Sequence, residues 1–534
     1  MNKTINLLFV IFILVFIYSC GKPQIKLDYF DNTLKLNLGA EPSILNPILF
    51  TDGPSAEIVG LIFNGLFKVA EDLSMKPDLV ASYKISSDGK IYIFKLRQDI
   101  FWHDGKKFTC DDVIFTFQKL FDLKTNTVRR SDFVISGKSI RFVKIDNYTL
   151  KAILPEPFAP FLVNLGIGIL PKHLLNNKNI NTADFNRHPI GTGPFKFVDW
   201  QTNQFVKLSR NDAYYFKKPK IARILFKIIP NENTAFIALK KGEIDLASIP
   251  IREVKRLKNN SEISIYNYYP LSYTYLGFNL KNPILKDLRV RQAIALAIDR
   301  KAMIKAVLRN FGKVAYVTES PYSWAYPDLK SIDKYTYNPE KTKKLLENLG
   351  YQYNQNTKFF EKDGKILEFT IITNKGNVYR EKTAEIIQQF LARSGIKVNI
   401  QLMEWSSFIK VINEPKDPKD FDLVLLGWSL SIDPDSYSLW YSKEYPRGFN
   451  FIGYNNKIID ELLVKERQSI NKAERKKVFQ EIYQVLAFEL PYYTLYYPEA
   501  VVGVNNRVRN LSKPSPLGVL FNIEDIYITN ENNR

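Results

Sequence analysis

The sequence predicts an α/β protein whose lobes carry a mixed insertion. Strands and helices alternate through the second half of the 534-residue chain, whereas the early region is rich in strands and hairpin turns. No Gly/Ser-rich linker separates independent domains and no repeat recurs at a fixed period. We therefore expect the lobes to be joined by crossing strands, which can act as hinges.

Local patterns define the early elements. Leu34, Leu36 and Leu38 stand at alternate positions, which predicts a strand. Tyr92, Phe94 and Leu96 alternate in the same way and predict another. Asp104-Gly105 is a strong hairpin signal between apolar segments. Thr109 and Asp112 have the spacing of a capping box, so a helix is expected to begin there.

Longer elements follow in the second half. Alternation at 224–228 predicts a strand, and the next helix is expected to be capped by Asn233 and stopped by Gly242. Further on, the patterns predict a helix after Asp287, a helix at 381–393, a buried strand at 421–426, a helix at 474–486 and an aromatic strand at 492–497.

Composition excludes most metal, haem and disulfide chemistry. The chain has 2 Cys and 3 His, too few for a disulfide scaffold, a zinc-finger array, a c-type haem or an iron–sulfur protein. We therefore expect no metal, no cofactor and no enzymatic activity. The 30 Tyr residues exceed what a core can easily satisfy, which indicates that some line a surface or cleft.

Residues 1–19 are predicted to be a lipoprotein signal peptide. Lys3 precedes an apolar stretch from residue 5 to 17, shorter than the roughly 20 residues of a membrane span. It ends in Ile-Tyr-Ser-Cys-Gly at 17–21, which resembles a bacterial lipobox and implies lipid attachment to Cys20. Residues 20–32 would be a tether on the extracytoplasmic or periplasmic face. The alternatives are an uncleaved anchor or an ordinary signal peptide.

The formal net charge of +20 is dispersed along the chain. Its densest clusters, at 217–220, 255–258 and 475–477, are short and typical of solvated faces. Since an exported protein has little access to nucleic acid, the charge indicates proximity to anionic lipid rather than nucleic-acid binding. Cys110 is expected to be a small buried residue at a helix start.

Catalytic motifs are missing from the sequence. It contains no Gly-x-Ser-x-Gly, no His-Glu-x-x-His and no Walker loop, and Pro171 occupies a glycine position of the dinucleotide fingerprint. Asp433-Pro434-Asp435 starts like a calcium loop, but Tyr437 stands at the next ligand position.

One loop has the composition of a binding site. Residues 427–441 follow the predicted buried strand and contain two Trp, two Tyr and two Asp. Ligands of open α/β sheets bind beyond the carboxyl ends of strands, aromatic rings give rigid contact area, and a carboxylate can hold an ammonium.

Short motifs across nearly the whole mature chain resemble family 5 extracellular solute-binding proteins, which include the peptide- and nickel-binding lipoproteins of ABC importers. They lie, in the family's order and spacing, at 41–47, 63–66, 77–79, 104–105, 108–113, 191–195, 242–245, 287–293, 421–423 and 427–428. The resemblance implies a two-lobed periplasmic-binding-protein-like fold with a hinge and an inserted α+β subdomain. Lobe I would comprise residues 33–50, 189–275 and 489–534, the insertion 51–188, and lobe II 276–488.

The resemblance also implies where the ligand binds. Peptide binders of the family carry an Asp three residues after the loop tryptophan, where this chain has Ser431. Asp433 would then take over the ligand's ammonium, or the ligand lacks a free amine. The expected ligand-binding residues are Trp428, Ser431, Asp433, Asp435, Tyr437, Trp440 and Tyr275.

We therefore expect a monomeric, lipid-anchored receptor that captures peptides between its lobes and delivers them to ABC permease subunits. One alternative keeps the transport role with an oligosaccharide, opine or metal–chelator cargo. The others are a hydrolase that uses paired carboxylates and an adhesin-like surface protein that does not close on a ligand.

Overall fold

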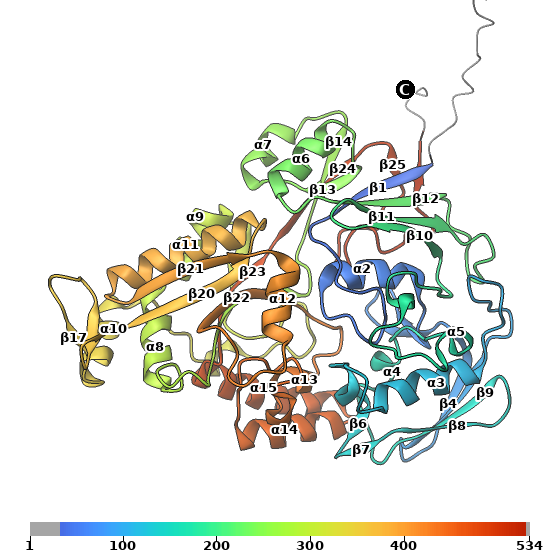
Figure 1. The fold of residues 1–534 in the computed structure, drawn as a ribbon, viewed down its shortest axis with the longest axis horizontal. Helices are drawn as coiled ribbons and strands as arrows, with labels where there is room; N and C mark the ends of the chain where they lie inside the picture. Colours follow the sequence, from blue (N-terminus) through green and yellow to red (C-terminus); the bar gives the residue numbers. More distant parts are fainter. Residues whose placement is uncertain (1–31, 530–534) are drawn as a thin grey trace, which may run out of the picture.

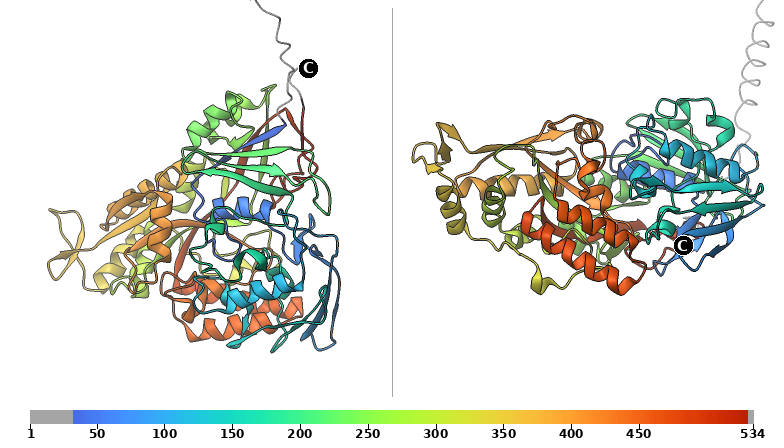
Figure 2. Two further views of the ribbon diagram at one scale, coloured as in Figure 1. Left: turned by 45° about the vertical axis from the view of Figure 1, so that its right-hand side comes forward. Right: turned by 90° about the horizontal axis from the view of Figure 1, so that it is seen from below.

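The computed structural model describes residues 32–529. The predicted signal peptide, Cys20 and all of the predicted tether except residue 32 lie outside the described residues. Figures 1 and 2 show the described chain as two bodies side by side, one built on each of the two large sheets. We call them lobe I and lobe II.

Lobe I contains a seven-stranded sheet in the order β10-β11-β12-β1-β13-β24-β14. The N-terminal strand β1 lies near its centre and pairs in parallel with β12 and β13, while the remaining pairs are antiparallel. The strands are β1 (Thr33–Leu38), β10 (Phe195–Gln201), β11 (Phe205–Arg210), β12 (Arg223–Ile228), β13 (Leu246–Ser248), β14 (Ile263–Tyr268) and β24 (Ala500–Asn505). Its helices are α6 (Glu232–Lys240), α7 (Val254–Leu257) and α2 (Gly53–Ile62), with the 3₁₀ turn η3 (Ile251–Glu253) and the tail pair β25 (Val508–Arg509) and β26 (Tyr527–Ile528). Helix α2 falls within the range 51–188 predicted for the insertion, but it contacts β10 of this sheet.

The structure confirms one local prediction in lobe I and corrects another. The alternating residues 34–38 form β1, as predicted. The cap of α6 is Asn231 and not Asn233, because the Asn231 side chain accepts the Thr234 N–H at 3.1 Å. The prediction was wrong by two residues since both positions hold asparagine.

An inserted α+β subdomain lies between β1 and β10. It has a four-stranded antiparallel sheet, β4 (Val80–Ile85), β5 (Ile91–Leu96), β9 (Thr149–Ile153) and β8 (Arg141–Lys144), in that order. Around it lie β2 (Phe67–Val69), β3 (Met75–Pro77), β6 (Val134–Ile135), β7 (Lys138–Ser139), α3 (Cys110–Phe121), α4 (Phe161–Asn164), α5 (Lys172–Leu175), η1 (Arg130–Phe133) and η2 (Asp184–Asn186).

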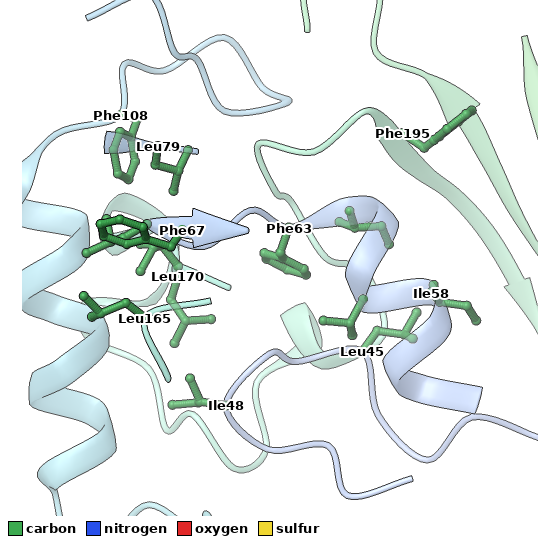
Figure 3. Close-up of a cluster of buried hydrophobic side chains, with 14 of the residues drawn as sticks. Leu45, Ile48, Ile58, Phe63, Phe67, Leu79, Phe108, Leu165, Leu170 and Phe195 are labelled. Carbon is green, nitrogen blue, oxygen red and sulfur yellow. The ribbon is translucent and has the colours of Figure 1, made fainter. Parts of the chain in front are cut away.

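The insertion shares one hydrophobic core with the sheet of lobe I. Figure 3 shows Phe195 of β10 and Ile58 of α2 in the same cluster as Phe67 and Phe108 of the insertion. The predicted Thr109–Asp112 capping box is present at the start of α3, and Cys110 is buried there as a free thiol. The insertion is thus fixed to lobe I by buried apolar surface.

Lobe II contains a six-stranded sheet in the order β16-β23-β15-β22-β20-β21. Its strands are β15 (Ser272–Phe278), β16 (Gly312–Val314), β20 (Glu368–Asn374), β21 (Lys397–Met403), β22 (Leu423–Ser429) and β23 (Tyr492–Pro498). Helices α8 (Leu288–Ala297), α9 (Arg300–Leu308), α10 (Pro339–Asn348), α11 (Val378–Arg393), α12 (Trp405–Asn413), α13 (Tyr437–Trp440), α14 (Lys457–Gln468) and α15 (Lys472–Glu489) surround it, with the turns η4 (Leu329–Ser331) and η5 (Ser442–Glu444) and the small sheet β17 (Gln352–Tyr353), β18 (Phe360–Lys362) and β19 (Lys365–Ile366).

The chain crosses between the lobes at two neighbouring places. It leaves lobe I after β14 and enters β15, and it returns from β23 to β24 through Glu499. The Tyr269 hydroxyl donates to Glu499 Oε2 at 3.2 Å, so the two crossings are bonded to each other. The predicted limits at 275/276 and 488/489 differ from these points, because β15 and β23 pair within the sheet of lobe II.

The described helices include none that is both long and apolar enough to cross a membrane.

A glycine turn at 191–193 holds α2 in place. The Gly193 N–H donates to Ile62 O at 2.8 Å, and the Gly191 N–H donates to His103 Nδ1 at 3.2 Å. His103 Nε2 lies 3.0 Å from Gly193 O, and burial lowers the pKa of this imidazole to about 4. The neutral ring therefore accepts at Nδ1 and donates at Nε2, and both bonds join the turn to the insertion. The bond from the Gly193 N–H to Ile62 O joins the same turn to α2.

The Gly191→Ala substitution should test this packing. An added Cβ would lie 1.9 Å from Ile62 O, so the backbone must move, and overpacking of this kind costs about 1–3 kcal/mol or more. Gly39→Ala is the matched control, since a Cβ there meets nothing within 4 Å. Urea unfolding should show a clear loss of stability for Gly191→Ala only; equal stability of the two variants would contradict the proposed close contact.

Candidate functional site

A cavity lies between the two lobes, with a volume of about 420 Å³. Lobe I and its insertion contribute the exposed face of α2, residues 129–133 and the turn at 163–168. Lobe II contributes the end of β22, the loop that follows it, and Phe449. Its volume falls within the roughly 300–1,000 Å³ of small-molecule sites.

The loop after β22 is held by two ion pairs with α14 and α15. Both oxygens of Asp433 accept from Arg475, at 2.7 Å and 2.6 Å. Asp435 accepts from Arg467 Nε at 3.0 Å and from Nη2 at 2.7 Å. Bidentate pairs of this kind fix a carboxylate in direction as well as in position. The two helices thus determine the shape of the cavity wall on the side of lobe II.

A third carboxylate, Glu466, lies in the same cluster. Its Oε2 accepts from Arg475 Nη2 at 2.8 Å, and its side chain is fully buried. Burial, together with the negative charge of Asp435, raises the pKa of Glu466 well above its usual range. Burial also acts on Asp435, but the adjacent Arg467 guanidinium keeps the pKa of that carboxyl below its ordinary value. With Glu466 protonated, two carboxylates balance two guanidinium groups and the cluster is neutral.

Arg467 also reaches the opposite lobe. Its Nη1 donates to Ser131 O at 2.8 Å in the insertion, and its own carbonyl accepts the Ala159 N–H at 2.8 Å. The guanidinium carbon lies 3.8 Å from the ring centre of Tyr437. One side chain therefore fixes the loop of lobe II and bridges to lobe I.

The structure brings four of the predicted residues to the cavity. Trp428, Ser431, Asp433 and Asp435 line it. The carboxylates of Asp433 and Asp435, however, are already paired with arginine side chains. A ligand ammonium at Asp433 would therefore have to share the Asp433 carboxylate with Arg475.

The other three predicted residues lie outside the cavity lining. Tyr437 stacks on Tyr441 with ring centres 4.2 Å apart. Trp440 and Tyr275 are fully buried and both pack against Tyr492, at 4.6 Å and 3.9 Å. The short helix α13 turns Trp440 back into the core, which composition alone does not reveal.

Sequence reasoning missed the wall that lobe I supplies. Arg129 and Asp132 line the cavity from the short turn η1 in the insertion. The Arg129 guanidinium stacks 4.3 Å from the Phe50 ring centre, and burial raises the pKa of Asp132 to about 6. The one sequence signal is a charged tetrapeptide, Arg-Arg-Ser-Asp, which matches no motif.

The described part of the chain offers little for metal binding or nucleophilic chemistry. Residues 32–529 contain no group of three or more His, Cys, Asp or Glu side chains placed to hold a metal ion. Cys110 lies in the core of the insertion, where burial raises the pKa of its thiol to about 12.

Replacing Glu466 by Gln should make the charge cluster less sensitive to pH. Because the pKa of Glu466 is raised in the folded protein, the folded wild type keeps a proton on Glu466 that the unfolded chain releases above about pH 4.5. The stability of the wild type therefore falls as the pH rises from there toward the raised pKa. Gln does not titrate and keeps an acceptor for Arg475. Glu466→Gln should therefore gain stability relative to wild type as the pH is raised from 5 to 8.

Glu461→Gln on the same helix is the control, because Glu461 is 69% exposed. Denaturant unfolding at pH 5 and at pH 8 should show that the stability of Glu461→Gln relative to wild type is the same at the two pH values. A gain for Glu466→Gln that is equal at the two pH values would mean that Glu466 is ionised in the folded protein.

Comparison with known proteins shows the family of this chain. A family model described as bacterial extracellular solute-binding proteins, family 5 Middle, matches residues 74–449. The oligopeptide-binding protein AppA of Bacillus subtilis is 34% identical over 512 residues, which cover 95% of this chain and 92% of that protein.

Two solved structures share the fold over nearly the whole chain. That of AppA from Bacillus subtilis in complex with a nonapeptide has a TM-score of 0.88 at 33% identity and covers 93% of this chain and 99% of that one. That of NikZ from Campylobacter jejuni in complex with Ni(L-His) has a TM-score of 0.84 at 33% identity, with the same coverage. These matches confirm the predicted two-lobed fold, and the chain belongs to family 5 of the bacterial extracellular solute-binding proteins.

Proposed function

We propose that this chain is the substrate-binding protein of an ABC importer, that it captures peptides between its lobes, and that it delivers them to the permease subunits. The observation that carries this proposal is the cavity itself, which draws its walls from both lobes. The names of the relatives, an oligopeptide-binding and a dipeptide-binding protein, support peptides as the cargo.

Closure on the ligand follows from the position of the cavity. A ligand that contacts both walls binds the closed form more strongly than the open form, and only this difference in affinity shifts the population. Because the crossings consist of two adjacent strand connections, the lobes can rotate about one line. The permease would then recognise the closed, loaded form.

The lining of the cavity suits a short polar chain with an apolar component. Rings of Phe50, Phe63, Trp428 and Phe449 lie together with the charged groups of Arg129 and Asp132. Aromatic rings contact side chains of varied shape, whereas the charges suit the ends or main-chain groups of a peptide. We also propose that the chain acts as a monomer and releases its ligand chemically unchanged.

Native mass spectrometry of the purified protein, followed by peptide titration, tests this function. We expect a co-purified peptide mass that collision removes intact, and a peptide mixture of two to nine residues that restores it. An oligosaccharide, an opine or a metal–chelator mass in its place would keep the transport role and overturn the peptide assignment. A hydrolysed ligand would support an enzyme instead, and an absence of closure by small-angle scattering would support an adhesin.

We further propose that Cys20 anchors the exported chain to a membrane through attached lipid. Metabolic labelling with a tritiated fatty acid should mark the wild type and leave Cys20→Ser unlabelled, since the thioether needs the sulfur. Cys110→Ser is the matched control, because Cys110 is buried in the insertion. Equal labelling of wild type and Cys20→Ser would exclude lipid attachment at this residue.

A further inference from the structure

Asp132 differs from the other carboxylates of the cavity. It is half-buried and lines the cavity from η1. Asp433 and Asp435 are each bonded to an arginine, whereas the carboxylate of Asp132 has neither a hydrogen bond nor an ion pair within 4 Å among residues 32–529. A half-buried carboxylate without a partner is costly, so its place at a cavity needs an explanation.

The neighbouring charges leave room for a cation at this point. Arg467 is nearby, but its guanidinium is committed to Asp435 and to the carbonyl of Ser131. Arg129 lies on the same turn with its guanidinium stacked on Phe50, and its Nε is a buried donor without an acceptor in the described structure. Two residues of the cavity lining, one on η1 and one at its start, therefore carry an unpaired carboxylate and an N–H without an acceptor.

We propose that Asp132 binds the ammonium group of the ligand and that Arg129 donates to an adjacent carbonyl or carboxylate oxygen of the same ligand. This inference rests on the proposed function and specifies its chemistry. The amine anchor then comes from the insertion in lobe I and not from the loop after β22. Asp433 and Asp435 shape that loop through Arg475 and Arg467.

The position of Asp132 also links the ligand to closure. The backbone carbonyl of the neighbouring residue, Ser131, accepts a hydrogen bond from Arg467 of lobe II. An ammonium held at Asp132 therefore lies next to a residue whose carbonyl accepts a hydrogen bond from lobe II.

Ligand affinity should then depend on pH. The groups that face Asp132 are Arg129, Arg467, Asp435 and Glu444, and the net result of burial and these charges is that the pKa of Asp132 is raised to about 6. An ammonium pairs with the ionised carboxylate only. Below about pH 6 the affinity for a free-amine peptide should fall nearly tenfold per pH unit, while an N-acetylated peptide should show no such fall.

The decisive experiment compares a peptide with its N-acetylated form by isothermal titration calorimetry at pH 7.5. Wild type should prefer the free amine by about 30-fold or more, the loss expected when one partner of a buried charge pair is removed. In Asp132→Asn this preference should shrink to near unity. Asp433→Asn should keep it, and so should Asp184→Asn, an exposed position on the same insertion.

Each result has a definite meaning. A preserved preference in Asp132→Asn, or equal weakening of both peptides, overturns the assignment, and loss of the preference in Asp433→Asn gives the amine to Asp433. If Asp132→Asn does not fold, the pH dependence of wild type decides, because a flat profile for the free-amine peptide contradicts the proposal. If wild type binds neither peptide, the proposed function itself fails; if it binds both and Asp132 is without effect, only the present inference fails.

Discussion

The structure of lobe II around the cavity depends on the two arginine side chains that neutralise Asp433 and Asp435, the aspartates that follow the buried strand β22. Asp433 and Asp435 stand on either side of Pro434, so both carboxylates leave the chain close together in a poorly hydrated place. Leaving either charge unpaired there would cost several kcal/mol. Arg475 of α15 and Arg467 of α14 remove this cost, and they thereby dock two helices against the loop.

The same arrangement couples the shape of the loop to the contact between lobes. Arg467 has donors to spare after pairing with Asp435, and one of them reaches the carbonyl of Ser131 across the cavity. Other bonds across the lobes run from the Ala159 N–H to Arg467 O at 2.8 Å and from Asn413 Nδ2 to Thr51 Oγ1 at 2.9 Å. Such bonds are worth only about 1 kcal/mol each, so they orient the closed form without fixing it. The free energy of the bound ligand can therefore decide between the open and closed forms.

The sequence predicts well those features whose cause lies within a few residues. The capping box of Thr109 and Asp112 and the buried strand that becomes β22 both come from short-range patterns, and the structure confirms them. Asn231 and Asn233 show the limit of such reasoning, because two residues of one type compete for one cap and only the backbone turn decides between them.

The binding residues could be predicted only where they stand on a recognisable motif. Trp428 lies near the end of β22 and Ser431 two residues beyond it, and both line the cavity. The partner of Asp433 is 42 residues away at Arg475, and Asp132 meets the loop after β22 only through the packing of two lobes. Trp440 and Tyr275 were expected at the ligand because aromatic residues suit a cleft, yet the same rings suit a core equally well.

The high tyrosine content has a comparable explanation. Five tyrosines that face the middle of the lobe II sheet, Tyr273, Tyr275, Tyr483, Tyr492 and Tyr493, are buried. The hydroxyls of Tyr273, Tyr275 and Tyr492 have no hydrogen-bond partner among the described residues. Part of the excess of rings that composition attributes to a cleft is therefore packed in the core of lobe II, where Tyr492 contacts Trp440. A residue type indicates what contacts are possible; whether a side chain serves the ligand depends on whether the protein has already supplied its partners.

The acidic residues of the cavity differ in whether the protein already supplies partners for their charge. Asp433 and Asp435 have their full set of donors from arginine, so further attraction for a cation is weak there and removing their charge mainly disturbs the loop. Asp132 lacks such donors and pays for its partial burial with a raised pKa. A cationic ligand would favour the ionised form and would gain the interaction that the folded protein leaves unmade. The insertion, whose apolar core fixes it to lobe I, therefore holds the carboxylate with the most to gain from the ligand.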